Sequence, residues 1–328
     1  MTVLITGGAG YVGAHIAHAA VDAGRDVVIL DNLSTGKRSN APGAARLIEG
    51  DLADADLLAD IFAGRAFSAP ISAVVHCAAS TSVAEAVGDP VGYYRNNAVN
   101  ALNLIEAAMR GGAESFVFSS TAAVYGEPRT DLIDENHPTE PATPYGASKL
   151  MAERMLRDAA AVSPMRYAIL RYFNVAGADP KGRAGQTNPD ARHVIKMAAD
   201  AALGRIPRFE IFGDDYDTPD GTCIRDFIHV SDLAEAHIEI IRYLEKGGPS
   251  DTFNCGNARG YSVREVAEEM RRTSKRNFEI KPAPRRQGDI PKVIANPKKI
   301  TRKTNWKPKK PNLKTMIQNA IKWEIKQK

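Results

Sequence analysis

The sequence is poor in cysteine and has no long apolar run. Its three cysteines, Cys77, Cys223 and Cys255, are odd in number and form no CxxC pair. This argues against a disulfide scaffold or a zinc site and suits a reducing compartment. No apolar run approaches the roughly 20 residues that cross a bilayer, and no signal peptide is visible in MTVLITGG. We therefore expect a cytoplasmic protein without bound metal or membrane contact.

The composition that remains is that of an ordinary soluble protein. The chain has 328 residues, of which 44% are hydrophobic and 25% charged. Such a chain is long enough to bury a sizeable core. Its length predicts two domains or one large domain.

Positive charge is concentrated at the C-terminal end. Residues 275–328 hold 17 Lys and Arg against 3 Asp and Glu, which leaves 26 (43 − 17) against 36 (39 − 3) elsewhere. A basic segment is compatible with a nucleic-acid partner. Here the lysines alternate with residues such as Pro and Ile rather than with stacking aromatics, which favours a solvated face around an anionic small-molecule site. Nucleic acid is therefore not the expected partner.

Apolar runs alternate with longer amphipathic segments in the first half of the chain. The runs are nearly continuous, as in strands buried on both faces of a parallel sheet. The expected strands are 2–6, 26–30, 71–78, 115–120 and 167–173. The expected helices are 11–24, 54–64, 91–111 and 145–161. This order predicts an α/β fold with a Rossmann-type doubly wound parallel sheet.

The alternation loosens after residue 174, where Gly, Pro and Asp cluster at 177–190 and 213–222. We expect helices at 191–203, 231–246, 262–274 and 312–326, and short strands near 209–212, 223–229, 252–255 and 277–281. The pattern predicts a nucleotide-binding domain over 1–173 and a smaller C-terminal α/β substrate domain over 174–328. Parts of 223–255 are expected to return to the first domain.

A glycine-rich turn follows the first expected strand and opens a helix. In GGAGYVG, Gly7, Gly10 and Gly13 have the spacing that lets backbone N–H groups approach a pyrophosphate. Asp31 ends the second strand, where a carboxylate accepts hydrogen bonds from a ribose and repels a 2′-phosphate. This favours NAD over NADP. The alternatives are a simple tight turn for the glycines and an exposed turn residue for Asp31.

Asp51 ends a third short strand in EGDLAD. Its carboxylate suits either the edge of an adenine or the N-cap of the next helix. Both interpretations stay open.

A tyrosine and a lysine are four residues apart in TPYGASKL, where we expect the start of a helix. Tyr145 and Lys149 then share one helix face. A free tyrosine has a pKa of about 10, and a nearby ammonium or the positive nicotinamide of NAD⁺ favours the phenolate. Such a base suits an alcohol whose hydride goes to a cofactor. Thr121, in SSTAAVYG, offers a hydroxyl to the same substrate oxygen.

Several motifs resemble a known family. GGAGYVG, SSTAAVYG and YGASK resemble the extended short-chain dehydrogenase/reductases. RYFNVAGAD (171–179), IFGDDYDTPDGTCIRDFIHVSDLA (211–234) and APRRQGDIP (283–291) closely resemble the UDP-glucose 4-epimerase family. The resemblance runs from residue 1 to about residue 325.

The resemblance implies a role for each matching residue. Tyr145 is the base, Lys149 holds the ribose and lowers the tyrosine pKa, and Thr121 bonds the sugar 4-oxygen. Besides Tyr145 and Lys149, the residues implied to contact NAD are Gly7, Gly10, Tyr11, Val12, Gly13, Asp31, Asn32, Thr35, Gly36, Asp51, Leu52, Cys77, Ala78, Thr81, Asn96, Ser119, Tyr172 and Phe173.

The residues implied to hold the UDP-sugar are Thr121, Asn174, His193, Val194, Phe212, Arg225, Arg286, Asp289 and Val293. Arg225 and Arg286 suit a diphosphate because a guanidinium presents a fork of donors. Asp289 suits a ribose hydroxyl. For His193 a histidine on a helix surface is the alternative. Two positions depart from the family: Thr81 stands where many relatives carry lysine, and Ala86 where serine is usual.

The implied reaction is reversible epimerisation at C4 of a UDP-hexose, UDP-glucose or UDP-galactose, through a 4-keto sugar. NAD is regenerated in each turnover and stays bound. A 4,6-dehydratase of the same fold needs an acid pair where this chain has Ala122 and Ala123, which argues against it. A non-catalytic nucleotide- or nucleic-acid-binding protein is the remote alternative, and the intact Tyr145/Lys149 pair argues against it.

The resemblance also implies an assembly and a sugar range. In relatives, the helices at 91–111 and 145–161 pair across a homodimer. Val293 takes the position that lines the sugar pocket, and its small side chain leaves room for a 2-acetamido group. We therefore expect N-acetylated UDP-sugars as additional substrates. A shift of one residue would place Lys292 or Ile294 there instead.

Overall fold

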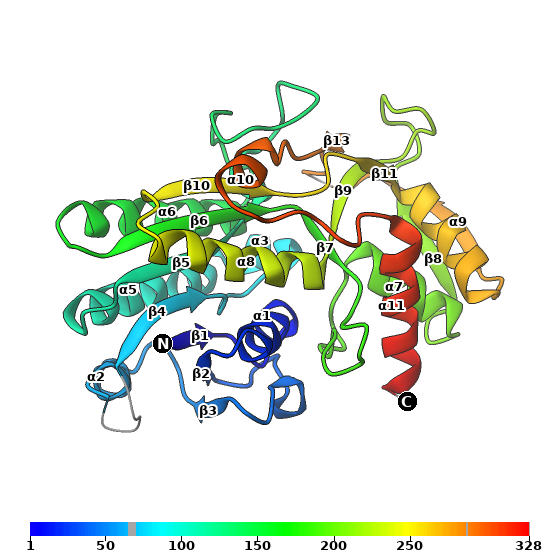
Figure 1. Cartoon of the computed structure of the whole chain (residues 1–328). Helices are drawn as coiled ribbons and strands as arrows, with labels where there is room; N and C mark the ends of the chain where they lie inside the picture. Colours follow the sequence, from blue (N-terminus) through cyan, green and yellow to red (C-terminus); the bar gives the residue numbers. More distant parts are fainter. Residues whose placement is uncertain (65–69, 287, 328) are drawn as a thin grey trace.

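A seven-stranded sheet forms the centre of the computed structural model, which describes residues 1–64, 70–286 and 288–327 (Figure 1). Its order is β10-β6-β5-β4-β1-β2-β3, and all neighbouring strands are parallel. The strands are β1 (Thr2–Thr6), β2 (Asp26–Asp31), β3 (Arg46–Glu49), β4 (Ile71–His76), β5 (Ser115–Thr121), β6 (Arg166–Tyr172) and β10 (Asp251–Cys255). The predicted Rossmann-type sheet is confirmed.

Helices cover both faces of this sheet (Figure 1). In β1, Val3 and Ile5 join the core beneath one group of helices, while Leu4 joins the core on the opposite face, because successive strand residues point to opposite sides. The first face carries α1 (Tyr11–Asp22) and α8 (Val230–Glu245). The second carries α2 (Ala55–Phe62), α5 (Asn100–Arg110) and α6 (Pro144–Ala161).

The segment expected as one helix over 91–111 is divided. Helix α4 (Pro90–Tyr94) leads into a π-helical turn (Arg95–Val99) and then into α5, and a further helix, α3 (Val83–Gly88), precedes them. The buried Asn97 lies in the π-helical turn, where its side chain bonds both the N–H and the carbonyl of Ser80 at 2.8 and 2.9 Å. The turn thereby ties this helical region to the loop after β4.

Besides α8 and β10, which pack with the central sheet, the described chain after residue 173 forms two smaller sheets and four further helices (Figure 1). The first sheet contains β7 (Asn174–Ala176), β9 (Ile224–His229), β11 (Gly260–Ser262) and β13 (Lys292–Val293). The second pairs β8 (Arg208–Phe212) with β12 (Glu279–Ala283). The helices are α7 (Val194–Ala202), α9 (Val263–Ser274), α10 (Lys298–Lys303) and α11 (Leu313–Lys326). Within the described ranges, no helix has the length and apolar content to span a membrane.

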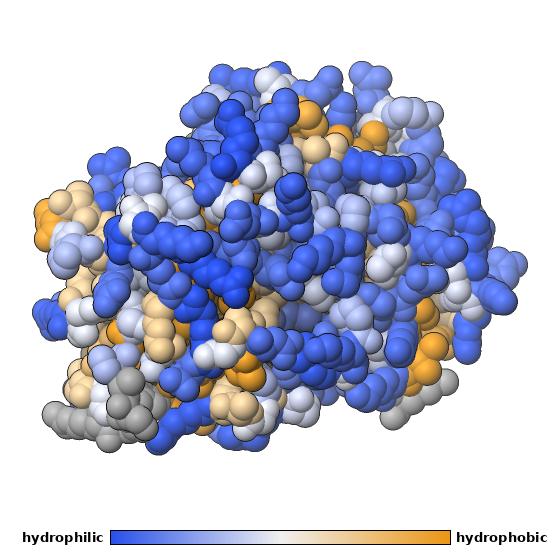
Figure 2. Space-filling model, in the orientation of Figure 1, coloured by the Kyte–Doolittle hydropathy of each residue, from blue (hydrophilic) through white to orange (hydrophobic). Residues whose placement is uncertain are grey.

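The strand order reverses direction at β1, which lies between β2 and β4. Ligands of open parallel sheets bind beyond the carboxyl ends of the strands at such a reversal. Gly7 follows β1 and Cys77 follows β4, so both residues lie at this edge. Figure 2 shows that the surface in the same orientation is largely hydrophilic, with apolar side chains in small separate groups.

Candidate active site

The glycine turn packs without space for side chains. A Cβ on Gly13 would lie 2.1 Å from the carbonyl oxygen of Gly7, and one on Gly7 would lie 2.7 Å from the backbone nitrogen of Ala78. Gly7 also has φ +70°, which favours glycine. Gly10 is the N-cap residue of α1, and among the described residues no side chain accepts a hydrogen bond from the first N–H groups of the helix. Its first N–H groups therefore form a cradle that fits a pyrophosphate.

Asp31 is buried beside this turn rather than exposed. Its two carboxylate oxygens accept hydrogen bonds from the backbone N–H groups of Ala9 and Leu33, each at 2.8 Å, and the residue is only 8% exposed. The exposed-turn alternative is therefore wrong. Gly36 lies against the same turn, because a Cβ there would be 2.8 Å from the carbonyl carbon of Ala9.

Asp51 does not cap the following helix. Helix α2 is capped by Asp54, which accepts from Leu57 N–H at 2.9 Å. The Asp51 carboxylate accepts from the Asn32 side chain at 2.7 Å and from Ala53 N–H at 2.9 Å. Of the two interpretations of Asp51, the N-cap is wrong.

The remaining predicted cofactor residues surround the same edge of the sheet. Leu52 is buried, and Asn96 donates to the Ser80 hydroxyl at 3.0 Å. Thr35 and Thr81 are exposed. Phe173 is buried in a cluster with Val124.

The reactive pair lies where the start of α6 meets the end of β5. Helix α6 is capped by Thr143, which accepts from Gly146 N–H at 3.2 Å. One turn of helix separates Tyr145 from Lys149, and both are buried, at 8% and 3% exposure. The Lys149 ammonium donates to the carbonyl of Ser119 at 3.0 Å. Tyr145 forms a side-chain hydrogen bond with Thr121.

Burial dominates the protonation of this pair. It raises the pKa of Tyr145, while the hydrogen bond with Thr121 acts in the opposite direction. Burial also lowers the pKa of Lys149 to about 8, against the opposing charges of Cys77 and Glu153. The lowered tyrosine pKa expected from Lys149 is therefore not found in the protein alone, where burial raises the pKa of Tyr145. The phenolate depends on further positive charge.

A histidine that the sequence analysis did not single out completes this region. His237 on α8 lies 2.8 Å from the Ser119 hydroxyl, and Ser119 lies 3.1 Å from the Cys77 sulfur. Burial lowers the pKa of His237 to about 4, so the ring is neutral. The ring of Tyr172 packs edge-on at 6.4 Å. The available signal was a single histidine within the apolar stretch LAEAHIEII.

On the other side of the site, two arginines converge on one carboxylate. The guanidinium groups of Arg225 and Arg286 lie 3.9 and 3.5 Å from Asp289. The guanidinium of Arg286 also lies 4.0 Å from the ring centroid of Phe212. The two guanidinium groups and the one carboxylate together carry one net positive charge. The guanidinium N–H groups can donate further hydrogen bonds, which suits an anionic ligand.

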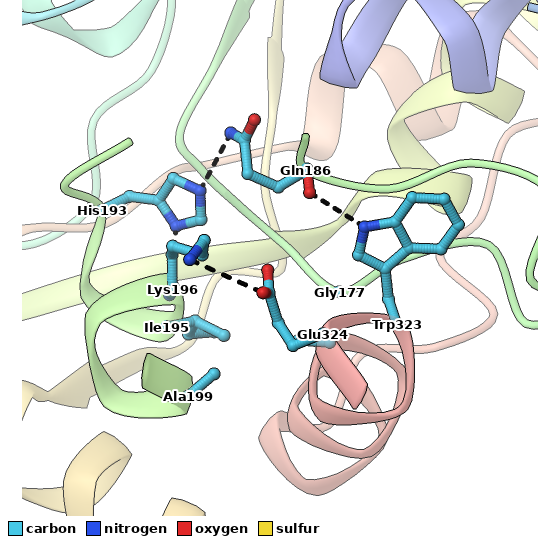
Figure 3. Close-up of a pocket in the computed structure, with 9 residues that line it drawn as sticks. Gly177, Gln186, His193, Ile195, Lys196, Ala199, Trp323 and Glu324 are labelled. Carbon is cyan, nitrogen blue, oxygen red and sulfur yellow. Dashed lines mark hydrogen bonds and ion pairs between the residues drawn. The ribbon is translucent and has the colours of Figure 1, made fainter. Parts of the chain in front are cut away.

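His193 links the glycine turn to the second part of the chain. Its Nδ1 accepts from Lys196 N–H at 3.4 Å, which makes it the N-cap of α7 just before Val194, and its Nε2 lies 3.2 Å from the Gln186 side chain (Figure 3). Its ring stacks on that of Tyr11 at 6.0 Å. Burial lowers its pKa to about 4. The surface-histidine alternative is therefore wrong.

Asn174 and Val293 lie on the small sheet that continues from β6. Asn174 opens β7, two residues after Tyr172. Val293 pairs with Arg225 in register and packs against the cluster of Val124 and Phe173.

The residues beside Val293 have other partners. Lys292 forms an ion pair with Asp131 at 2.5 Å, and the Ile294 carbonyl accepts from Ile133 N–H at 2.9 Å. Val293 packs against the cluster that contains Val124, in the segment following Thr121. Among the described residues, no group of His, Cys, Asp and Glu is arranged to hold a metal ion.

Comparisons with known proteins agree with this arrangement. Residues 3–256 match the model of the NAD dependent epimerase/dehydratase family. A UDP-glucose 4-epimerase of Azospirillum brasilense is 51% identical over 98% of this chain and 91% of its own length.

Solved structures are similar over almost the whole chain. A UDP-glucose 4-epimerase from Brucella ovis in complex with NAD is 39% identical, with a TM-score of 0.93 over 98% of this chain and 97% of that one. The UDP-Glc/GlcNAc 4-epimerase from Campylobacter jejuni is 44% identical, with a TM-score of 0.86 over 99% of both chains.

Proposed function

Since the chain belongs to the NAD dependent epimerase/dehydratase family, we propose that its site interconverts UDP-glucose and UDP-galactose by epimerisation at C4 with bound NAD. The observation that carries this proposal is the pairing of Tyr145 with Thr121, with Lys149 one helical turn away. These groups lie at the edge of the sheet where a nucleotide binds.

The residues of the glycine turn suit NAD. The turn is too tight for side chains, and Asp31 is held at the end of β2, where a carboxylate selects a ribose without a 2′-phosphate. When NAD⁺ is bound, it supplies the hydride acceptor and a positive charge next to the sugar. The contacts that we propose for individual residues are those implied by the family motifs.

Tyr145 acts as the base and later as the acid. Its phenolate removes the proton of the sugar 4-hydroxyl and returns it to the 4-oxygen after the keto sugar has presented its other face. Thr121 holds the 4-oxygen next to the phenol. Lys149 keeps the ammonium form below a pH of about 8 and so favours the phenolate once the positive cofactor is present.

The diphosphate and the ribose of the substrate belong to the second part of the site. Arg225 and Arg286 bind the diphosphate, which displaces their long contacts to Asp289. Asp289 then accepts from a ribose hydroxyl. Ala122 and Ala123 have no proton to donate, so dehydration is not favoured.

We extend the proposal to N-acetylated sugars. Val293 lies beside Val124 and offers only methyl groups, which leaves space for a 2-acetamido group. The similar protein from Campylobacter jejuni is called a UDP-Glc/GlcNAc 4-epimerase, in agreement with this range.

The proposed function also implies a division of the chain into two domains and a mode of assembly. We propose an NAD-binding domain over residues 1–173 and a UDP-sugar domain over 174–328, to which the strand β10 and helix α8 are exceptions because they pack with the first sheet. We also propose a cytoplasmic homodimer that pairs through α4, α5 and α6.

The test is an incubation of the purified protein with UDP-galactose and no added cofactor, followed by analysis of the sugar. We expect UDP-glucose to form, and we expect NAD in the supernatant of the denatured protein. A protein that releases NADP, or that turns over only with added NADPH, would be a net reductase instead.

A further inference from the structure

A third residue shares the helix face of the reactive pair. Glu153 follows Tyr145 by eight residues and Lys149 by four on α6, so all three lie on one side of the helix. Its side chain has no exposure to solvent. The proposed reaction gives this carboxylate no part, yet a buried charge persists only where it is fully bonded.

The Glu153 carboxylate has four donors. Oε1 accepts from the Ser120 hydroxyl at 2.6 Å and from Arg171 Nε at 2.8 Å. Oε2 accepts from Arg171 Nη2 at 2.6 Å and from Arg157 Nη2 at 2.9 Å. Glu153 thus joins α6 to both β5 and β6.

The two strand partners are next to residues of the site. Ser120 lies between Ser119, which accepts from Lys149, and Thr121, which bonds Tyr145. Arg171 immediately precedes Tyr172 on β6. A shift of α6 along its axis would therefore break the bonds of Glu153 and displace both reactive groups from β5.

Arg171 is held in place by a second contact, with the ring of Tyr125. Its guanidinium is 4% exposed and lies 4.9 Å from the ring centroid of Tyr125. The Tyr125 hydroxyl donates to Asn254 on β10 at 2.7 Å. The anchor of α6 therefore extends across β5, β6 and β10.

We propose that Glu153 is a positioning residue of the epimerase, which holds α6 in the register that sets Tyr145 against Thr121 and Lys149 against Ser119. The proposal rests on the proposed function, because it assigns a purpose to the position of those two side chains.

The charge of Glu153 acts on the same lysine. Burial would raise the pKa of Glu153, but the bonds and charge of Arg171 bring it below its usual range, so the carboxylate stays ionised. Three titratable groups face Lys149. The Glu153 charge opposes the lowering of the Lys149 pKa by burial, the Cys77 thiol is neutral near pH 8 because burial raises its pKa to about 11, and the Lys149 charge contributes to a pKa of about 3 for His76. Removal of the Glu153 charge should therefore make Lys149 lose its proton at a lower pH.

The test replaces Glu153 by glutamine and measures the pH profile of UDP-galactose turnover. For the unmodified protein we expect kcat to fall as the pH rises through about 8, where Lys149 deprotonates. In Glu153→Gln we expect the same fall in kcat to occur at a lower pH. We also expect kcat to fall by about tenfold or more, with KM changed much less, because misplacement of the reactive groups affects the chemical step.

Two further variants separate position from charge. Asp158→Asn makes the same carboxylate-to-amide change on the same helix, but Asp158 is exposed and pairs with Arg154 at the surface, so its profile should match the unmodified protein. Glu153→Asp keeps the charge, so kcat should fall at the same pH as in the unmodified protein. Its loss of kcat should be smaller than that of Glu153→Gln. A folded, NAD-containing Glu153→Gln protein with unchanged kcat and pH profile would overturn the proposal.

A second readout does not depend on turnover. In protein labelled with ¹³C at lysine Cε, the signal of Lys149, assigned by its absence in Lys149→Met, should titrate near pH 8 and move lower in Glu153→Gln. If Glu153→Gln shows this shift but the unmodified protein shows no epimerisation, the proposed function fails while the effect of the Glu153 charge on Lys149 stands. An unchanged titration in Glu153→Gln would contradict the charge effect.

Glu153→Gln can also prevent folding, because loss of the carboxylate leaves the Arg171 guanidinium buried without a counter-charge. The variant with both Glu153→Gln and Arg171→Gln removes this charge imbalance and undergoes the same measurements. Because this variant loses a positive charge together with the negative one, its Lys149 titration should move less than in Glu153→Gln. The bonds that hold α6 to β5 and β6 are still lost, so kcat should fall as in Glu153→Gln, and an unchanged kcat in this folded variant counts against the proposal.

Discussion

At the scale of single residues, burial keeps Tyr145 as a neutral phenol, whereas the proposed chemistry needs the phenolate. Burial raises the pKa of Tyr145 and lowers that of Lys149 to about 8, so the protein alone favours the neutral phenol. We propose that the positive charge of bound NAD⁺ shifts the balance toward the phenolate, so that binding of the cofactor activates Tyr145.

The first prediction concerns this base. Tyr145→Phe removes only the phenolic oxygen and its hydrogen bond with Thr121, which costs about 1 kcal/mol of stability. We expect normal folding and retained NAD, but a loss of turnover by a factor of about 10² to 10⁴. Steady-state kinetics with a parallel assay of bound nucleotide measure both. Turnover near that of the unmodified protein would show that another residue is the base.

The second prediction concerns sugar size. Val293 packs against the cluster of Val124, and a tyrosine there would place a ring where a 2-acetamido group is proposed to lie. Val293→Tyr should therefore abolish turnover of UDP-N-acetylgalactosamine and spare UDP-galactose, because a side chain that fills the pocket excludes the larger sugar. Parallel kcat/KM values for the two substrates test this. Equal losses for both, or no turnover of the N-acetylated sugar by the unmodified protein, would count against Val293 as the determinant.

Single residues were predictable from the sequence where a local motif carries them. Gly7, Asp31 and Tyr145 follow strands or start helices, so their neighbours define their place. His237 bonds Ser119, 118 residues away along the chain, and Glu153 bonds Ser120, 33 residues away, so no local pattern marks these contacts. Their partners exist only once the strands and helices are assembled.

At the scale of elements, buried strands were easier to predict than short exposed ones. The five apolar runs of the first half correspond to β1, β2, β4, β5 and β6. The strands β7, β11 and β13 have only two or three residues each, too few for a period to appear. The π-helical turn was missed because it depends on the contact of Asn97 with Ser80, not on local propensity.

The third prediction concerns the junction of β1 and α1. A Cβ at Gly13 would meet the Gly7 carbonyl at 2.1 Å, a backbone atom that cannot turn aside. Gly13→Ala should therefore push α1 from the turn and reduce the NAD content of the purified protein. Gly43→Ala is the matched control, since nothing lies within 4 Å of a Cβ there. Full NAD content in Gly13→Ala would be incompatible with a pyrophosphate cradle at this turn.

At the scale of the whole molecule, the basic C-terminal segment balances an acidic remainder. Lys299 pairs with Asp251, and Lys309 with Glu235 at 3.1 Å. Surface pairs of this kind add little stability. They do show that part of the positive charge of residues 275–328 faces acidic groups of the same chain, which agrees with a small anionic substrate rather than a polyanion.

The fourth prediction concerns assembly. Large apolar side chains are exposed along α4, the π-helical turn, α5 and α6, namely Val91, Val99, Leu102 and Met151. We expect a dimer by light scattering, with the double variant Leu102→Glu and Met151→Glu shifted to monomer. Ile325→Glu changes an equally exposed residue on α11 and should leave the dimer intact. A monomeric unmodified protein at working concentration would exclude this assembly.

In the proposed reaction, the hydrogen at C4 leaves the sugar as a hydride and returns to the same carbon. This can be measured with UDP-galactose that carries deuterium at C4, incubated with the purified protein in ordinary water without added cofactor. We expect UDP-glucose with deuterium still at C4, because only the hydroxyl proton passes through Tyr145. Loss of the deuterium to solvent would contradict this proposal, since the C4 hydrogen would then have left as a proton.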